Sequence, residues 1–167
     1  MVSTLGHGSV FTLVLPASTE ATEAPAESQA ATADSPTARV LIIDDEPDVV
    51  QTLAEILTAQ GHDVMTADSG MRALGLIEGH NFDVILSDVR MPNLDGPSLY
   101  AALERKDPSL LRRTAFVSGD TLSPSARVFL QRVQRPFIEK PFTLDEVRGL
   151  IAQILAEQAQ GASHKAP

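Results

Sequence analysis

Between Arg39 and Gln158 the chain alternates five times between a short apolar run and a longer amphipathic stretch. The apolar runs occupy residues 39–44, 62–67, 82–88, 113–119 and 136–140, and the amphipathic stretches occupy 46–61, 69–80, 96–106, 123–134 and 143–158. Continuous apolar runs are typical of strands buried on both faces, and regular strand–helix alternation predicts a parallel sheet. We therefore expect an α/β fold: a doubly wound, five-stranded parallel sheet with helices on both faces.

The 167 residues divide into four predicted parts. Residues 1–15 end in an alternating pattern typical of a strand. Residues 16–38 contain no aromatic residue, no large aliphatic residue and no Lys or Arg, so we expect a flexible linker rich in Ala, Pro, Ser, Thr and Glu. Residues 39–158 form the predicted α/β domain, and 159–167 a tail too short for an output domain.

Composition excludes several classes of function. A net charge of −9 argues against a nucleic-acid or anionic membrane surface. The absence of cysteine excludes disulfides and thiolate metal sites. No apolar run approaches the roughly 18 residues that a membrane helix needs. We expect this fragment to be cytoplasmic and to make no membrane contact, although a parent protein could be membrane-anchored.

Polar residues follow the predicted strands where each strand ends. Asp44 and Asp45 follow the first strand, while Asp88, Ser118 and Lys140 end the third, fourth and fifth. In an open α/β sheet, ligands bind beyond the carboxyl ends of the strands, at the point where the strand order reverses. With a strand order of 2-1-3-4-5, three acids, a hydroxyl and an ammonium group would converge there.

Such a cluster needs a cation. Two carboxylates about 4 Å apart repel each other by roughly 4 kcal/mol at an effective dielectric constant near 20. Lys140 offsets only part of the repulsion among three acids, and an all-oxygen set of ligands suits Mg²⁺. With that charge neutralised, Asp88 could act as a nucleophile toward phosphorus, forming an aspartyl phosphate.

At these positions the sequence resembles the receiver domains of two-component response regulators, whose fold is flavodoxin-like. The resemblance covers about residues 39–158 and rests on "DD" at 44–45, "SDVRMPNLDG" at 87–96, "VSG" at 117–119 and "EKPF" at 139–142. The spacing also fits, with 43 residues from Asp45 to Asp88, 30 from Asp88 to Ser118 and 22 from Ser118 to Lys140.

The resemblance implies a role for each matching residue. Asp88 would accept a phosphoryl group from a phosphohistidine. Asp45, Asp88 and the backbone carbonyl of Arg90 would hold Mg²⁺, with Asp44 acting partly through water. The domain would thus phosphorylate itself and slowly hydrolyse the product.

Three further residues would complete the site and its switch. Lys140 would pair with one phosphoryl oxygen, Ser118 would hydrogen-bond to another, and Phe137 matches the family's switch aromatic. Phosphorylation would then re-form the surface of the fourth helix, fifth strand and last helix, through which a homodimer could assemble.

Each residue also has a simpler interpretation when it is taken alone. Asp44 or Asp45 could cap the following helix, and Ser118 could satisfy the backbone at a strand end. Lys140 could be a solvated surface charge, Phe137 a core residue, and "MPNLDG" an ordinary turn. The ordered set favours the functional interpretation.

The N-terminal segment "GSVFTLVLP" at residues 8–16 resembles the last strand of a histidine kinase's ATP-binding domain. Together with the linker and receiver, this implies the C-terminal receiver of a hybrid histidine kinase. An unrelated N-terminal strand is the alternative.

The leading hypothesis is a phosphorelay receiver whose partner is a histidine kinase or a histidine phosphotransfer domain. Two other classes compete with it. One is a receiver-like interaction domain that is never phosphorylated. The other is an aspartyl-phosphate phosphatase of the haloacid dehalogenase type, which the order of the acidic motifs disfavours.

Overall fold

The computed structural model describes residues 2–4, 8–10, 37–119 and 123–163. The chain divides into two units, Met1–Asp34 and Ser35–Pro167. In the first unit, β1 (Val2–Thr4) pairs antiparallel with β2 (Gly8–Val10). The alternating residues 11–15, the linker up to residue 36 and the end of the predicted tail lie outside the described residues.

The second unit is built on a five-stranded sheet. Its strands are β3 (Arg39–Ile43), β4 (Asp63–Ala67), β5 (Val84–Asp88), β6 (Thr114–Ser118) and β7 (Phe137–Glu139). They lie in the order β4-β3-β5-β6-β7, and every neighbouring pair is parallel. Counted within the domain this is 2-1-3-4-5, so the predicted fold class and strand order are confirmed.

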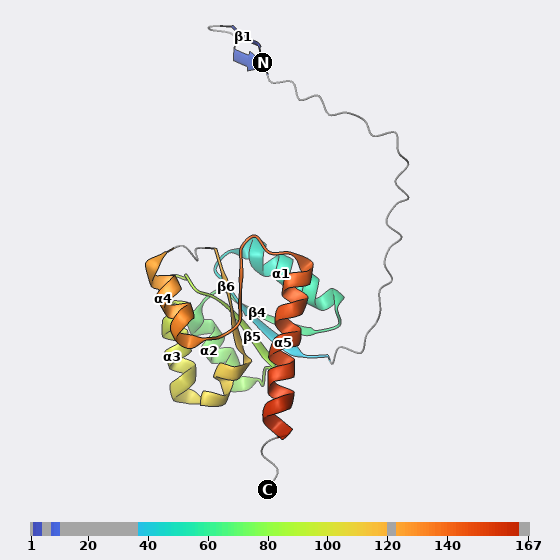
Figure 1. Ribbon diagram of the computed structural model, residues 1–167, viewed down its shortest axis with the longest axis vertical. Helices are drawn as coiled ribbons and strands as arrows, with labels where there is room; N and C mark the ends of the chain where they lie inside the picture. Colours follow the sequence, from blue (N-terminus) through green and yellow to red (C-terminus); the bar gives the residue numbers. More distant parts are fainter. Residues whose placement is uncertain (1, 5–7, 11–36, 120–122, 164–167) are drawn as a thin grey trace. The chain divides into compact units, whose positions relative to one another are not determined.

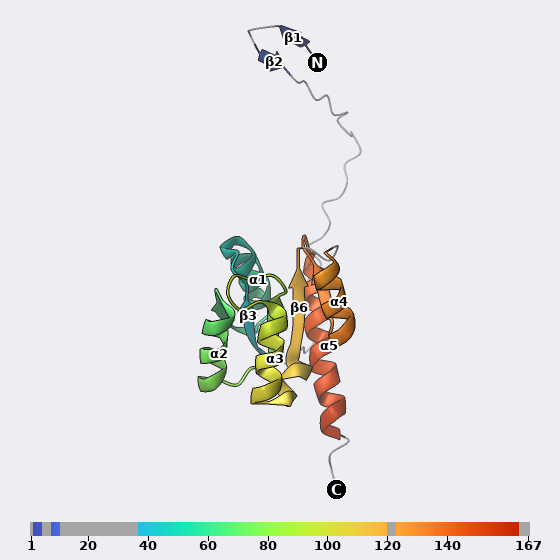
Figure 2. The same cartoon turned by 90° about the vertical axis from the view of Figure 1, so that its left-hand side faces the viewer.

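Helices cover both faces of this sheet (Figures 1 and 2). They are α1 (Pro47–Ala59), α2 (Gly70–Gly79), α3 (Gly96–Lys106), α4 (Pro124–Val133) and α5 (Leu144–Ser163). A 3₁₀ helix, η1 (Pro108–Arg113), lies between α3 and β6 and was not predicted. The last helix continues five residues beyond Gln158, where the sequence pattern ended.

The alternation of side chains along the strands divides the core between the two faces. Val40 and Ile42 of β3 pack with α1 and α5, whereas Leu41 and Ile43 pack with α2 and α3. All four side chains are almost fully buried. Successive strand residues point to opposite faces, so one continuous apolar run supplies both cores.

The α4 helix packs through a cluster that combines aromatic rings with the aliphatic side chains of Ala126 and Leu130. Phe129 of α4 meets Phe116 of β6 edge-on at a centroid separation of 5.0 Å, and Tyr100 of α3 contacts both rings. Phe116 and Phe129 are buried, whereas Val128 on the same helix is exposed. This cluster anchors the inner face of α4 beside the end of β6.

The end of the domain opposite the polar strand ends is held by side-chain bonds to the backbone. Arg135 donates hydrogen bonds to the carbonyls of Thr114 and Arg112 and pairs with Glu157 of α5 at 2.9 Å. Gln158 donates to the carbonyl of Asp83. These contacts fix α5 against the beginnings of β5 and β6.

No helix in the described part of the chain is both long enough and apolar enough to span a bilayer.

Candidate functional site

The carboxyl ends of four strands meet at one edge of the sheet. Register places Ile43 of β3 beside Ser87 of β5, and Asp88 beside Val117 of β6. Ser118 then pairs with Glu139 of β7. Asp44, Asp88, Ser118 and Lys140 therefore come together at this edge, as their positions at the strand ends predict.

Lys140 contacts three carboxylates. Its Nζ lies 2.7 Å from Asp44 Oδ2, 2.8 Å from Glu46 Oε1 and 3.8 Å from Asp88 Oδ2. The backbone N–H of Lys140 donates to the carbonyl of Ser118 at 2.8 Å, which ties the lysine to the end of β6. We call the group formed by Asp44, Glu46, Asp88 and Lys140 the acidic pocket.

Burial governs the electrostatics of the acidic pocket. Asp44 is 2% exposed and Asp88 is 5% exposed. Burial raises the pKa of Asp88 to about 6, and the Asp44 carboxylate adds to this rise. The Lys140 ammonium and the backbone N–H groups of Val89 and Arg90 act in the opposite direction and lower the pKa. Without a further cation the Asp88 carboxylate is therefore incompletely compensated.

Lys140 responds to the same surroundings. Burial alone would lower the pKa of Lys140, but its contacts with Asp44 and Glu46 outweigh burial and raise that pKa above the ordinary value. The lysine is therefore a fixed positive charge at neutral pH rather than a proton donor. It can stabilise negative charge that develops beside Asp88.

The residues fit a hard divalent cation. Oxygens of Asp44, Glu46 and Asp88 all lie within 4.8 Å of one another. Asp44 Oδ2 is fully buried and has Lys140 as its ion-pair partner, but it accepts no hydrogen bond of regular geometry from the described residues. Carboxylate oxygens with unused acceptor capacity are the ligands that Mg²⁺ prefers.

Glu46 is the member of this group that the sequence analysis missed, and Asp45 is the acid that lies outside it. Asp45 is exposed, and Asp44 and Glu46 flank it. Residues two apart point to the same side of an extended chain. The run of three acids at residues 44–46 therefore indicates an acidic site, but it does not show which of the three side chains take part in it. The predicted role of Asp45 as a ligand remains a prediction.

The loop after Asp88 is held by its own sequence. Asp95 caps α3 by accepting the N–H of Ser98 at 2.9 Å. The N–H of Gly96 donates to the carbonyl of Val89, and a Cβ at Gly96 would lie only 2.9 Å from the Asp88 carbonyl oxygen. Only glycine allows this close approach. The "LDG" turn thus packs against the backbone of the strand end that carries Asp88.

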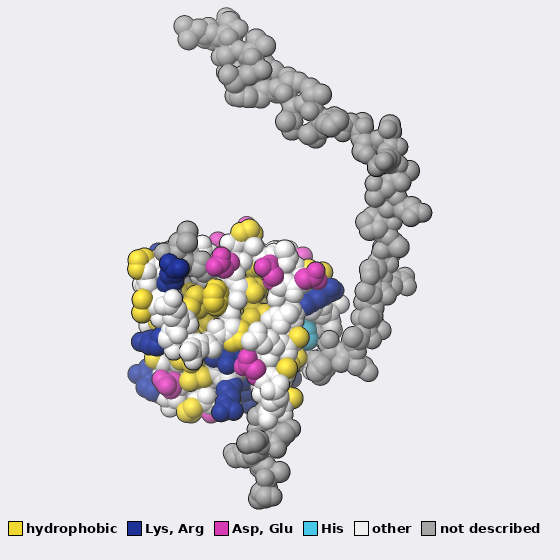
Figure 3. Space-filling view, viewed as in Figure 1, with side chains coloured by type: hydrophobic (Ala, Val, Ile, Leu, Met, Phe, Trp, Pro, Cys, Tyr) yellow, Lys and Arg dark blue, Asp and Glu magenta, His cyan; other side chains and the backbone are white. Residues whose placement is uncertain are grey.

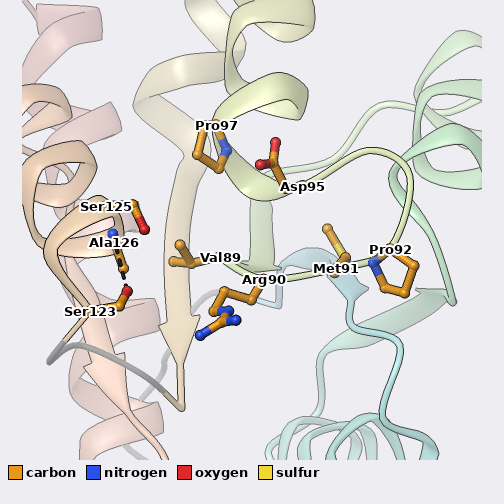
Figure 4. Close-up of a pocket in the computed structure, with 9 residues that line it drawn as sticks. All are labelled: Val89, Arg90, Met91, Pro92, Asp95, Pro97, Ser123, Ser125 and Ala126. Carbon is orange, nitrogen blue, oxygen red and sulfur yellow. Dashed lines mark hydrogen bonds between the residues drawn. The ribbon is translucent and has the colours of Figure 1, made fainter.

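Beside this strand end lies a cavity of about 530 Å³. It is lined from one side by Val89, Arg90, Met91, Pro92, Asp95 and Pro97, and from the other by Ser123, Ser125 and Ala126 of α4 (Figure 4). Ser123 caps α4 by accepting the N–H of Ala126. Arg90, two residues after Asp88, therefore lines this cavity.

The two predicted switch residues differ in exposure. Ser118 is 1% exposed at the end of β6, whereas Phe137 is 43% exposed on β7, the edge strand. Val128 of α4 and Leu144 of α5 are also exposed, so α4, β7 and α5 each carry an exposed apolar side chain. We call the surface of these three elements the α4–β7–α5 face, and Figure 3 shows hydrophobic side chains between α4 and α5. The described geometry thus pairs a buried hydroxyl in the site with an exposed aromatic side chain on this face.

Comparison with known proteins identifies the family. Residues 40–152 match the family profile of the response regulator receiver domain. The chain belongs to this family. Receiver domains are the phosphorelay modules of two-component signal transduction, and the two competing hypotheses are not favoured.

Curated relatives include both kinases and regulators. The chain is 32% identical over 166 residues to the sensor kinase CckA of Brucella abortus, and 38% identical over 109 residues to a response regulator receiver protein of Anaeromyxobacter. These matches cover 93% and 64% of this chain. The chain spans 17% of the length of the first relative and 46% of the second.

Solved structures agree with the fold. The chemotaxis protein CheY4 of Vibrio cholerae is 27% identical, with a TM-score of 0.65 over 72% of this chain and 100% of that chain. NtrX of Brucella abortus is 26% identical, with a TM-score of 0.69 over 77% of this chain and 30% of that chain.

Proposed function

We propose that this receiver domain accepts a phosphoryl group on Asp88 from a phosphohistidine. An Asp88 carboxylate oxygen attacks phosphorus, the new O–P bond forms as the P–N bond breaks, and the released imidazole takes up a proton. The observation that carries this proposal is the juxtaposition of the buried Asp88 carboxylate with the Lys140 ammonium at 3.8 Å. Lys140 neutralises charge on the incoming group, and Ser118 donates a hydrogen bond to a phosphoryl oxygen.

Asp45, Asp88 and the backbone carbonyl of Arg90 would hold Mg²⁺, with Asp44 acting partly through water and Glu46 as a further acid close to Asp44 and Asp88. When bound, the ion would neutralise the carboxylates and phosphoryl oxygens, so that two negatively charged groups can approach. The protein's own contribution is orientation. The Val89 N–H donates to Asp88 Oδ1 at 2.8 Å, and Asp88 Oδ2 is the oxygen that lies 3.8 Å from the Lys140 Nζ. Oδ2 would be the attacking atom in this proposal.

Intact-mass measurement after incubation with acetyl phosphate tests this proposal. We expect one added phosphoryl group on the wild-type protein with Mg²⁺, and none without Mg²⁺ or in Asp88→Asn. Asp83→Asn is a matched control, because Asp83 precedes the same strand at its other end. Phosphorylation of Asp88→Asn, or metal-independent phosphorylation of the wild type, would contradict the proposal.

We further propose that phosphorylation switches the α4–β7–α5 face. Ser118 would move toward the phosphoryl group and Phe137 would turn inward from its exposed position. The backbone hydrogen bond from the Lys140 N–H to the Ser118 carbonyl supports this coupling, because it joins the two phosphoryl-binding residues at the end of β7, the strand that begins with Phe137. A homodimer through this face would bury its apolar side chains, and light scattering before and after phosphorylation tests that step.

The parent protein, in this proposal, is a hybrid histidine kinase whose receiver lies in the cytoplasm, whether or not the kinase itself is anchored in a membrane. The similarity to a sensor kinase over 93% of the chain supports it, because that match extends beyond the receiver itself. Residues 1–15 would be the end of the kinase's ATP-binding domain, and residues 16–38 the linker. The partners would be a histidine kinase or a histidine phosphotransfer domain and no nucleic acid. Phosphotransfer from the purified parent kinase to this receiver is the test.

A further inference from the structure

The Lys140 ammonium lies closer to Glu46 than to Asp88. The Lys140 Nζ lies 2.8 Å from Glu46 Oε1 but 3.8 Å from Asp88 Oδ2. Asp44 Oδ2 also lies close to the ammonium, at 2.7 Å. The ammonium therefore pairs directly with the two acids of the loop after β3, and only at longer range with the proposed phosphoacceptor.

The backbones at both ends of this contact are anchored. The N–H of Glu46 donates to Asp44 Oδ1 at 2.9 Å, and the N–H of Lys140 donates to the Ser118 carbonyl at 2.8 Å. A shift of the ammonium toward Asp88 must therefore come from the side chains, not from the loops. Of the two acids, the Glu46 side chain is 62% exposed and the Asp44 side chain 1% exposed. Glu46 is the partner that water can readily replace.

We propose that Glu46 is a positioning residue that fixes the Lys140 ammonium in the unphosphorylated protein. A phosphoryl group on Asp88 must then break the Lys140–Glu46 ion pair before it can bind the ammonium. This inference rests on the proposed function. Glu46 would then have two opposing effects. Its carboxylate, within 4.8 Å of those of Asp44 and Asp88, strengthens attraction for a divalent cation. Its hold on Lys140 weakens binding of the phosphoryl group.

The opposing effects make a measurable signature. In Glu46→Gln, Mg²⁺ affinity should fall by about three- to tenfold, because one nearby negative charge is lost. At saturating Mg²⁺, affinity for beryllofluoride, a phosphoryl analogue, should rise by about two- to fivefold, because an ion pair with an exposed partner is weak. A residue that served only to stabilise the loop would not move the two affinities in opposite directions.

Glu46→Asp separates the effect of the negative charge from the effect of side-chain length. The shorter side chain keeps the negative charge but draws back from Lys140, so Mg²⁺ affinity should stay near the wild-type value while beryllofluoride affinity rises. Glu55→Gln is the matched control, because Glu55 is an exposed acid on α1 that accepts a hydrogen bond from Gln51 and is not part of the acidic pocket. It should leave both affinities unchanged.

Amide NMR titrations of the four proteins, first with Mg²⁺ and then with beryllofluoride, provide both affinities without any turnover measurement. Opposite shifts in Glu46→Gln, together with a selective beryllofluoride gain in Glu46→Asp, would support the inference. If the wild type binds both ligands and the Glu46 variants bind them with the same affinities as the wild type, the inference is overturned but the proposed function is not. A wild type that binds neither ligand would overturn the proposed function, and the inference with it.

Discussion

At the carboxyl ends of the strands this receiver buries charge, whereas on the α4–β7–α5 face it exposes apolar side chains. Asp44 and Asp88 are almost fully buried in contact with Lys140, while Val128 and Phe137 are 64% and 43% exposed. Burying charge and exposing apolar surface both cost free energy. In both regions, binding of a ligand or a partner can therefore offset an unfavourable contribution to the free energy of the folded protein.

The two regions also differ in how firmly they are held. The acidic pocket lies at the ends of β3 and β5, which are flanked by neighbours on both sides, whereas the α4–β7–α5 face includes a three-residue edge strand. The uncompensated charge of the acidic pocket favours binding of a cation or a phosphoryl group. An edge strand with one neighbour can change its conformation at a lower free-energy cost than a central strand. This division suits a switch in which a local charge change is read at a distance.

We expect the largest effect on the acidic pocket from Lys140→Ala. Removal of the ammonium leaves the buried Asp44 and Asp88 carboxylates without their shared cation, and breaking a buried pair in this way typically costs about 3–5 kcal/mol. Urea unfolding without metal should show this loss of stability. Lys106→Ala is the control, since the exposed Lys106–Glu78 pair should contribute only about 0–1 kcal/mol. Equal losses in the two variants would show that the acidic pocket is not electrostatically distinctive.

Gly96→Ala should damage the pocket through the backbone. A Cβ at this position would press on the Asp88 carbonyl and the Val89 Cα at 2.9 Å, which should cost about 1–3 kcal/mol and slow phosphorylation. Gly75→Ala, in the exposed middle of α2 with open space around it, should instead stabilise the protein by about 0.5–1 kcal/mol. Thermal unfolding of both variants checks the contrast. If Gly96→Ala were as stable as Gly75→Ala, the close approach of Gly96 to the backbone of Asp88 and Val89 would not require glycine.

Asp88→Asn should stabilise the metal-free protein while abolishing its response to Mg²⁺. The folded-state pKa of Asp88 is raised from 3.8 to about 6, so the folded protein binds more protons than the unfolded chain between these values. This group's contribution to stability is therefore full below about pH 3.8 and is lost as the pH rises through about 6.

At pH 8 in EDTA, Asp88→Asn should thus exceed the wild type by about 1–3 kcal/mol, and the difference should shrink toward pH 4. Urea unfolding across this range, repeated with Mg²⁺, provides the measurement. A difference that does not change with pH would argue that Asp88 carries no electrostatic cost.

Much of the fold could be predicted from the sequence because its signals are local and repeated. The apolar run of β3 identifies a strand buried on both faces, and strand-end positions alone brought Asp88, Ser118 and Lys140 together. Glu46 was missed because a run of three acids does not reveal which of the side chains contact Lys140. The bonds of Arg135 to Thr114, Arg112 and Glu157 connect segments far apart in sequence, and no local pattern could reveal them.

The smallest expected effect lies on the α4–β7–α5 face. Val128→Ala removes exposed apolar surface and should change stability by less than about 0.5 kcal/mol, with phosphorylation unaffected. Its neighbour Phe129, buried against Phe116 and Tyr100, provides the contrast, because Phe129→Ala should cost about 3–5 kcal/mol. Equilibrium unfolding of the two variants distinguishes the outward side of α4 from its inward side, and a large loss in Val128→Ala would show that the face is already packed.

The most direct test of the coupling between the two regions is an amide NMR titration of the Mg²⁺-loaded wild type with beryllofluoride. The switch account predicts shifts that begin in the loop after Asp88 and extend across residues 118–145, including β7 and the start of α5. Shifts confined to the loop after Asp88 would mean that charge in the acidic pocket does not reach the α4–β7–α5 face.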